Sequence, residues 1–216
     1  PLGTHLMLKA PQPLSINHVI DTFDCGVPSM NDWLKRRAAQ NQASGATRTF
    51  VCTDANDHAI AYYALASSAI APAATPGRFR RNMPDPIPVV VLARLAVTTS
   101  YQGKSIGMAL FQDAGRRVIH AAEAIGINRI VFTSTVAVYG FAPPDTGEDG
   151  AIAPFNDYGR TKAEAEAIYA EWQRADPDQR SLVIIRPTVV FGERNRGNVY
   201  NLLKQIASGA FVMIGP

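Results

Sequence analysis

The sequence predicts an α/β fold in which a mixed sheet, built around a central strand–loop–helix–strand unit, is continued by a second strand–helix–strand segment. Three observations lead to this prediction. Two β-rich runs are joined by a short polar turn, a β-branched run leads through a glycine-bearing loop into an amphipathic helix, and a strand–helix–strand pattern recurs after residue 129. Strands that alternate with helical patterns are typical of α/β domains.

Composition limits the size and the environment of the protein. The chain has 216 residues, of which 47% are hydrophobic and 18% charged, so it is long enough for one sizeable core or two small domains. No apolar run has the length of a membrane span, and no secretory signal peptide is recognisable. We therefore expect a cytoplasmic protein without a membrane partner. Its fold should begin at Met7, because residues 1–6 resemble a cloning remnant.

The two cysteines, Cys25 and Cys52, are far apart in the sequence and have no metal-ligand spacing. Such cysteines are typical of free thiols in a reducing compartment, and a single disulfide is the less favoured alternative. We therefore expect no metal centre in this protein.

The charges are unevenly distributed. Residues 1–128 hold 12 Lys and Arg against 8 Asp and Glu, whereas residues 129–216 hold 9 against 10. Basic residues cluster at 35–37 and again at 78–81. Such clusters usually form a solvated face, but two of them in one half also leave room for an anionic partner, such as RNA or a phosphorylated cofactor.

The first elements are predicted to be a helix and a hairpin. Residues 28–42 have helical spacing, and Ser29 begins a pattern that resembles a capping box. The β-rich runs 47–53 and 59–70 flank a polar turn and predict two hairpin strands. Residues 71–88 are rich in Pro and Arg, and because proline lacks an amide donor they cannot lie inside a sheet.

A strand–helix–strand unit follows the loop. Residues 89–99 are a long β-branched strand, residues 103–126 an amphipathic helix, and residues 130–132 a second strand. This order predicts a parallel crossover between the two strands. One face of the helix should be buried, since its apolar side chains recur every four residues, at Ile106, Leu110, Ala114, Val118 and Ala122.

The loop between strand and helix, residues 97–110, predicts an anion site. A glycine-bearing turn that leads into a helix presents free backbone amides at the positive end of the helix dipole. Small residues matter there, because a Cβ would keep a pyrophosphate away from the backbone. The residues concerned are Gln102, Gly103, Lys104, Ser105, Ile106, Gly107 and Met108.

This loop resembles the acyl-CoA loop of the GNAT acetyltransferases, whose pattern is Gln/Arg-x-x-Gly-x-Gly/Ala. Ser105 stands where the first motif glycine belongs, and it could cap the helix or offer its hydroxyl to a phosphate. In that family the edge of the preceding strand holds the pantetheine arm of acetyl-CoA. The resemblance assigns this role to Leu95, Ala96 and Val97.

The resemblance extends over about residues 10–127 and is most specific for the acetyltransferase toxins of bacterial toxin–antitoxin pairs. It implies acetyl-CoA as cofactor, aminoacyl-tRNA as acceptor, and a ribbon–helix–helix antitoxin or a homodimer as partner. The basic residues that would suit tRNA phosphates are Arg36, Arg37, Arg80 and Arg81. In that family a later segment carries a tyrosine that acts as general acid. No such segment follows the strand at Ile130, and Tyr139 is the nearest tyrosine that could replace it.

The remainder resembles the middle of the extended short-chain dehydrogenases, the NAD(P)-dependent epimerase and dehydratase group. The matching segments are VFTSTVAVYG, YGRTK and SLVIIRPTVVFG, which imply a partial Rossmann-like βαβ unit with Thr135, Tyr158 and Lys162 as catalytic residues. Tyr158 and Lys162 are four residues apart, so they share one helix face. A neighbouring ammonium favours the phenolate form, and the tyrosine can then exchange a proton with a substrate hydroxyl.

The two resemblances divide the chain into an acetyl-CoA-binding region, residues 7–128, and an epimerase-like region, residues 129–216. No Gly-x-x-Gly-x-x-Gly turn stands in the sequence, so NAD(P) would lack its pyrophosphate cradle. Three functions stay open for this apparent chimera. They are a GNAT-type N-acetyltransferase impaired by its missing tyrosine, a nucleotide-sugar epimerase or dehydratase, and a non-catalytic binding protein.

Overall fold

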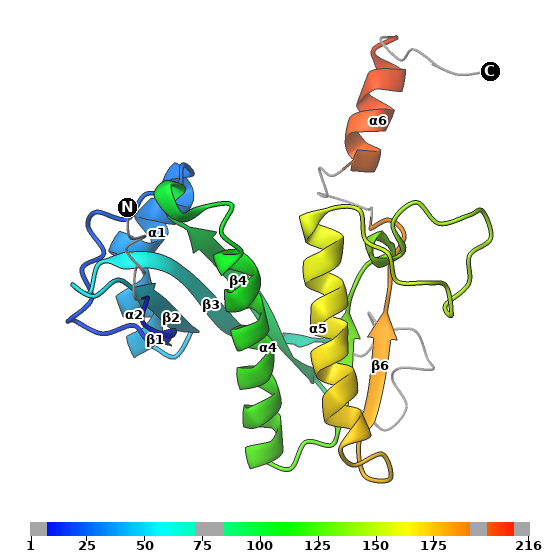
Figure 1. The fold of residues 1–216 in the computed structure, drawn as a ribbon, viewed down its shortest axis with the longest axis horizontal. Helices are drawn as coiled ribbons and strands as arrows, with labels where there is room; N and C mark the ends of the chain where they lie inside the picture. The colour runs from blue at the N-terminus through cyan, green and yellow to red at the C-terminus, as the bar shows by residue number, and fades with distance from the viewer. Residues whose placement is uncertain (1–7, 72–83, 191–197, 210–216) are drawn as a thin grey trace, which may run out of the picture. The chain divides into compact units, whose positions relative to one another are not determined.

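The computed structural model describes residues 8–71, 84–190 and 198–209, and it divides the chain into two compact units (Figure 1). Unit 1 runs from Pro1 to Ile127 and unit 2 from Asn128 to Pro216. Antiparallel pairing holds the sheet of unit 1, and parallel pairing holds the strands of unit 2. The molecule is therefore a mixed α/β protein, as the sequence predicts.

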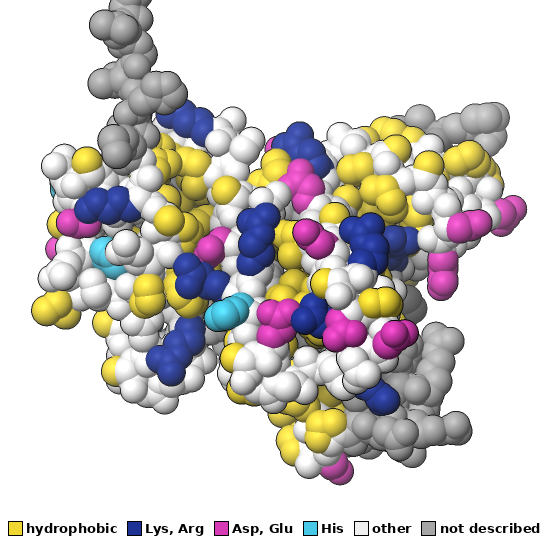
Figure 2. All heavy atoms as spheres, turned by 60° about the horizontal axis from the view of Figure 1, so that its bottom comes forward, with side chains coloured by type: hydrophobic (Ala, Val, Ile, Leu, Met, Phe, Trp, Pro, Cys, Tyr) yellow, Lys and Arg dark blue, Asp and Glu magenta, His cyan; other side chains and the backbone are white. Residues whose placement is uncertain are grey.

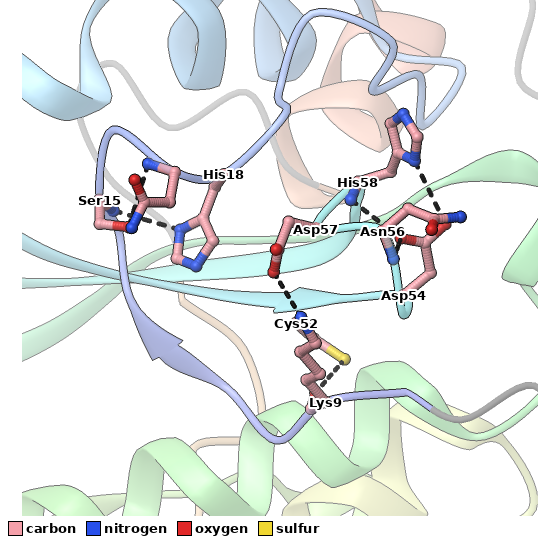
Figure 3. Close-up of polar contacts among 9 residues, drawn as sticks. Lys9, Ser15, His18, Cys52, Asp54, Asn56, Asp57 and His58 are labelled. Atoms are coloured by element: carbon pink, nitrogen blue, oxygen red, sulfur yellow. Dashed lines mark hydrogen bonds and ion pairs between the residues drawn. The ribbon is translucent and has the colours of Figure 1, made fainter.

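Unit 1 contains a four-stranded antiparallel sheet in the order β1-β2-β3-β4. The strands are β1 (Gln12–Pro13), β2 (Thr47–Thr53), β3 (Ala59–Ile70) and β4 (Ile87–Val97). The hairpin of β2 and β3 has the bounds that the sequence predicts. Its turn is closed by Asp54, whose carboxylate accepts the amides of Asn56 and His58 at 2.9 Å each (Figure 3).

Helices cover both faces of this sheet. They are α1 (Pro28–Arg36), α2 (Ala38–Ala43) and α4 (Ile106–Ala124). Successive strand residues point to opposite faces, so the neighbouring, fully buried Tyr62 and Tyr63 enter different cores. The Tyr62 ring contacts Phe23 and Trp33, and its hydroxyl donates to the Met30 carbonyl at 2.9 Å. Tyr63 packs with residues of α4 on the other face.

The predicted helix over residues 28–42 is broken in two at Arg37, and its capping differs from the prediction. Helix α1 begins at Pro28 with Val27 at the N-cap, so the capping box expected at Ser29 is wrong. Proline at the first helical position needs no amide partner, which favours this earlier start. The Asn31 side chain instead accepts the amide of Cys25 at 3.0 Å.

The N-terminal segment is fastened to the hairpin by two side chains (Figure 3). The Lys9 ammonium pairs with the Asp57 carboxylate at 2.6 Å, and the Cys52 thiol donates to the Lys9 carbonyl at 3.1 Å. Both cysteines, Cys25 and Cys52, are buried and free. Among the described residues, no group of His, Cys, Asp or Glu could hold a metal ion.

Unit 2 is built on a two-stranded parallel sheet of β5 (Arg129–Thr133) and β6 (Ser181–Ile185). Helix α5 (Asp157–Arg174) connects the two strands and packs on β6 (Figure 1). It also contacts β5, where the Phe132 ring lies 4.6 Å from the ring of Tyr169. The short helix η3 (Val136–Tyr139) follows β5, and α6 (Asn198–Ala207) lies further along the chain.

The predicted parallel crossover between the strand at 89–99 and the strand at 130–132 is wrong. Among the described residues, β4 is an edge strand of the antiparallel sheet, and β5 pairs with β6 instead. The register of the parallel pair explains why β5 pairs with β6, because all five residues of β5 have a partner in the segment Ser181–Ile185. Its own crossover through α5 therefore supplies β5 with a complete neighbouring strand.

The face drawn in Figure 2 mixes hydrophobic, basic and acidic side chains. No described helix combines the length and the hydropathy that a bilayer-spanning segment requires.

Candidate functional site

The loop after β4 is held firmly against the start of unit 1. The Thr98 amide donates to the Ile60 carbonyl at 2.8 Å, and the Thr98 hydroxyl donates to the Asp24 carbonyl at 2.8 Å. The Gln102 side-chain amide donates to the carbonyls of Val97, at 2.9 Å, and Cys25, at 3.1 Å. These bonds fix the direction in which the chain leaves the strand and enters helix α4.

The backbone of β4 presents hydrogen-bonding groups at an open edge. Because the Thr98 amide points toward β3, alternation along an antiparallel strand turns Ala96 toward β3, and Leu95 and Val97 away from it. No described strand lies on that outer side. The Val97 carbonyl already accepts Gln102, which leaves the backbone groups of Leu95 as the more accessible ones.

The amides at the start of α4 are free of helical partners. The first helical bond runs from the Ala109 amide to the Ser105 carbonyl at 3.1 Å, so the amides of Ile106, Gly107 and Met108 precede it. Ser105 occupies the N-cap with a φ of 59°, and its side chain makes no capping bond. The predicted N-cap position is therefore present, with the hydroxyl uninvolved in the cap.

Gly107, Lys104 and Gly103 have different roles in the structure of this loop. A Cβ at Gly107 would lie 3.7 Å from the side chains of Leu95 and Val97, which is ordinary contact, so packing does not demand glycine there. The Lys104 ammonium donates to the Ser100 carbonyl at 3.1 Å and lies 4.7 Å from the Tyr101 ring centre. It adds a positive charge beside the free amides. Gly103 has a φ of 73°, a left-handed conformation that favours glycine.

Two of the four arginines predicted to contact RNA lie within the described residues. Arg36 and Arg37 are exposed at the end of α1, and Arg36 makes a weak ion pair with Asp32 at 3.8 Å. Arg80 and Arg81 lie outside the described residues.

Unit 2 brings Thr135, Tyr158 and Lys162 to the wall of one cavity of about 330 Å³. Its other lining residues are Thr133, Ser134, Pro187, Thr188, Val189, Val190 and Val199. The Lys162 ammonium donates to the Thr133 carbonyl at 2.9 Å. Burial lowers the pKa of Lys162, and the Glu166 carboxylate acts in the opposite direction.

The start of α5 is placed by a close helix contact. The Asn156 side chain accepts the Gly159 amide at 2.8 Å and caps the helix. A Cβ at Gly159 would overlap the Ala137 carbonyl, so only glycine lets α5 approach η3 this closely. Tyr158, at the second helical position, thereby lies on the wall of the cavity that Thr135 also lines.

Tyr139 belongs to a buried polar network. Its hydroxyl donates to the Glu148 carbonyl at 3.0 Å and accepts a hydrogen bond from the Arg186 guanidinium. Arg186 also holds Glu166 through two bonds, at 2.9 and 2.7 Å. Both functions of the hydroxyl are engaged, so we do not propose Tyr139 as the acid of an acetyl transfer. No sequence motif predicts this network, and its one signal in the sequence is a charged residue, Arg186, directly after the apolar strand β6.

Comparison with known proteins confirms the resemblance to the epimerase and dehydratase group. The model of the NAD dependent epimerase/dehydratase family matches residues 78–215. The chain belongs to this family. A relative in Escherichia coli O157:H7, an N-acetyl-α-D-glucosaminyl-diphospho-ditrans,octacis-undecaprenol 4-epimerase, is 56% identical over 100 residues, which are 46% of this chain and 30% of that protein. UDP-glucose 4-epimerase of Vibrio cholerae is 35% identical over 95 residues and 28% of its length. The chain thus spans less than a third of these epimerases.

The first resemblance is shown independently. The tRNA-acetylating toxin of Mycobacterium tuberculosis is 44% identical over 124 residues, which are 57% of this chain and 74% of the toxin. The chain therefore also belongs to the family of these GNAT-type toxins. AtaT, solved in complex with acetyl-methionyl-tRNAfMet, matches 56% of this chain and 75% of its own with a TM-score of 0.50 at 26% identity. A variant of KacT gives the same TM-score and identity. The predicted double resemblance is confirmed.

Proposed function

We propose that unit 1 binds acetyl-CoA between the outer edge of β4 and the first turn of α4. The observation that carries the proposal is the juxtaposition of two sets of backbone groups on one loop. The amides of Ile106, Gly107 and Met108 have no acceptor within the helix, and Leu95 and Val97 turn their groups to an open strand edge. The amides would hold the pyrophosphate and the strand edge the pantetheine amides.

The residues present fit this cofactor. The second residue of the helix is Gly107, Lys104 adds a cation, and β4 offers an edge without a described neighbouring strand. When bound, acetyl-CoA would supply a thioester as acyl donor. The chain's own contribution is to bind and orient the donor beside an amine, and such positioning by itself accelerates transfer. Without a tyrosine acid in the expected segment, we expect slow transfer.

The acceptor we propose is the amine of an aminoacyl-tRNA. The Mycobacterium tuberculosis relative is named a tRNA-acetylating toxin, and AtaT was solved with an acetylated methionyl-tRNA. Exposed Arg36 and Arg37 offer charges for RNA phosphates. A ribbon–helix–helix antitoxin and a homodimer stay part of this proposal as the partners that the toxin family implies.

The test is thermal unfolding and calorimetry with acetyl-CoA and, separately, with NAD. A ligand that binds only the folded state must raise the melting temperature. We expect a shift with acetyl-CoA and none with NAD. Absence of a shift at saturating acetyl-CoA would refute the proposal. Transfer of labelled acetyl groups to methionyl-tRNA then measures the activity itself.

A second candidate function rests on the cavity of unit 2. Thr135, Tyr158 and Lys162 line this cavity. They lie within the residues that match the model of the NAD dependent epimerase/dehydratase family. We propose that these residues bind a hydroxyl group of a sugar, with Tyr158 as the proton-exchanging group and Lys162 as its neighbouring cation. The sequence contains no glycine-rich turn for the cofactor, so the proposal covers substrate contact and not a complete redox reaction.

A further inference from the structure

Lys162 brings an amine to the wall of the cavity of unit 2. Its nitrogen donates a hydrogen bond to the Thr133 carbonyl at 2.9 Å and lies 5.1 Å from the centre of the Phe132 ring. The side chain is half-buried and lines the cavity of about 330 Å³ together with Tyr158. Because a neutral amine still carries hydrogens, the bond to Thr133 persists when Lys162 loses its proton.

Lys104 of unit 1 makes the same two kinds of contact on the surface. Its nitrogen donates to the Ser100 carbonyl at 3.1 Å and lies 4.7 Å from the centre of the Tyr101 ring, but the residue is exposed. Burial lowers the pKa of Lys162, because the charged form loses solvation, while the Glu166 carboxylate acts in the opposite direction. A larger neutral fraction makes a lysine a better nucleophile toward carbonyl compounds. The cavity is therefore what distinguishes Lys162 from Lys104.

A second observation on the same wall points to a ligand with a polar group. Ser134 also lines the cavity, and the residue is only 4% exposed. Among the described residues its buried hydroxyl has no hydrogen-bond partner, whereas the Thr135 hydroxyl next to it accepts the Ala137 amide at 3.2 Å. Buried polar groups are nearly always paired, so we expect a ligand in the cavity to supply the partner of Ser134.

The rest of the wall selects an uncharged ligand with a short apolar tail. Part of the described lining is apolar, namely Pro187, Val189, Val190 and Val199. Lys162 is the one charged residue among the described residues that line the cavity. An anionic ligand would favour the ammonium form, which burial disfavours. An aldehyde or ketone on a short aliphatic chain has no charge, offers its oxygen to a hydroxyl and reacts with a neutral amine.

We propose that Lys162 forms a reversible imine with short aliphatic aldehydes that enter the cavity of unit 2, and that Tyr158 supplies the proton for the departing water. This inference goes beyond both candidate functions, since it requires neither a dinucleotide nor a sugar. It uses the neutral form of Lys162, whereas the sugar contact uses the charged form.

The reaction is a balanced condensation. The Lys162 nitrogen attacks the carbonyl carbon, the C–N bond forms, and a proton released by the nitrogen passes to the carbonyl oxygen. The C–O bond then breaks, and the oxygen leaves as water with a proton from the Tyr158 hydroxyl. The tyrosinate recovers a proton from the iminium nitrogen, so one aldehyde and one amine give one imine and one water. Tyr158 and Lys162 share one face of α5, which places the acid beside the amine.

The test traps the imine by reduction on the full chain. The protein is incubated at neutral pH with butanal and sodium cyanoborohydride, and peptide mass mapping measures the butylation of each lysine. We expect Lys162 to be modified at least about tenfold faster than Lys104, because Lys162 combines a larger neutral fraction with a cavity that positions the aldehyde. Equal rates at the two lysines, or slower modification of Lys162, would overturn the proposal.

The dependence of the rate on butanal separates a binding cavity from a merely reactive amine. The rate at Lys162 should saturate, whereas the rate at Lys104 should rise in proportion to the concentration. A rate at Lys162 that never saturates would overturn the cavity as the binding site. Ser134→Ala should raise the half-saturating concentration at Lys162 by about threefold or more, since it removes the hydroxyl that meets the aldehyde oxygen. An unchanged value would exclude Ser134 as a contact.

The acid is tested by Tyr158→Phe. This variant should slow the modification of Lys162 by at least about tenfold and leave that of Lys104 unchanged. Tyr200→Phe is the matched control, because Tyr200 is an exposed tyrosine of α6, and it should change neither rate. Tyr158 is itself 58% exposed, so the variant is expected to fold, and circular dichroism checks this. An unchanged rate at Lys162 in Tyr158→Phe would overturn the role of the tyrosine.

Discussion

The two units hold their candidate sites by different physical means. In unit 1 a four-stranded sheet is covered on both faces, and its central tyrosines, Tyr62 and Tyr63, are fully buried. In unit 2 the described residues form a sheet of two strands, and the register partners Val131 and Val183 are 45% and 38% exposed. Parallel sheets are normally covered on both faces. Unit 2 therefore depends on local devices more than on a large core.

Those local devices are a polar network and close glycine contacts. Arg186 joins Glu166 of α5 to Tyr139 of η3, and Gly159 lets the same helix touch η3. The first site, by contrast, uses backbone groups at a strand edge and at a helix start, and the side chains of Thr98 and Gln102 hold the loop between them. We therefore expect the first turn of α4 to tolerate uncharged substitutions, whereas the polar network and the glycine contacts of unit 2 should tolerate few changes.

The largest effect is expected at the first turn of α4. Gly107→Asp should weaken acetyl-CoA binding by more than about 100-fold, since it places a carboxylate beside the amides proposed for the pyrophosphate. The fold should survive, because a Cβ at this position makes only ordinary contacts at 3.7 Å. Gly107→Asn is the isosteric neutral control and should cost much less. Calorimetry measures both, and unchanged affinity in Gly107→Asp would refute the loop assignment.

Unit 2 should respond strongly to loss of its ion pair. Glu166→Gln removes the charge that faces Arg186, whose side chain is 20% exposed, and should destabilise unit 2 by about 3 kcal/mol. Glu171→Gln, on an exposed position of α5, is the control. In a Trp33→Phe background, Trp172 is the remaining tryptophan and its fluorescence reports denaturant unfolding of unit 2. An unchanged midpoint would show that packing, and not this network, holds the unit.

A moderate effect is expected for RNA. Arg36→Ala with Arg37→Ala should weaken tRNA binding by about tenfold at low salt and reduce the salt slope by about one to two. The same loss should occur for different tRNAs, because phosphate contacts carry no sequence information. Filter binding over a range of salt concentrations measures it. A salt response that does not change would mean that these arginines only face water.

The stability of unit 1 should fall at alkaline pH, because two tyrosines are buried in its core. Burial raises the pKa of Tyr62 to about 12, and Arg94 acts in the opposite direction. Burial and Asp113 also raise the pKa of Tyr63. Since the folded-state pKa of Tyr62 exceeds the unfolded value near 10, the stability that Tyr62 contributes is complete below about pH 10 and is lost as the pH rises through about 12.

The corresponding variant is Tyr62→Phe. It should flatten the fall of the melting temperature between about pH 10 and pH 12, and it should cost about 1 kcal/mol at neutral pH through the lost hydrogen bond to Met30. Tyr101→Phe, on the loop surface, is the control. Equal pH profiles for the variant and the unsubstituted protein would exclude Tyr62 as the titrating group.

The smallest effect tests the independence of the two sites. Tyr158→Phe removes one hydroxyl from the cavity of unit 2 and should leave acetyl-CoA affinity unchanged within about twofold. Calorimetry on the full chain is sufficient. A strong loss of affinity would show that the cavity of unit 2 forms part of the acetyl-CoA site.

Much of the local structure follows from the sequence alone. Period-two and period-four patterns give the hairpin of β2 and β3, the buried face of α4, and the two family resemblances, because these depend on neighbours a few residues apart. The motif spacing of Tyr158 and Lys162 likewise requires nothing beyond a helix. The sequence could therefore propose both sets of site residues before any fold was known.

Pairing and burial were decided only by the tertiary structure. The sequence predicted that β4 would pair with the strand at 130–132, but β6, some fifty residues further on, offers that strand a full register. The bond from Arg186 to Tyr139 likewise joins segments that are 47 residues apart in the chain. Strand partners and polar networks are chosen by competition among distant segments, and no local pattern records the outcome.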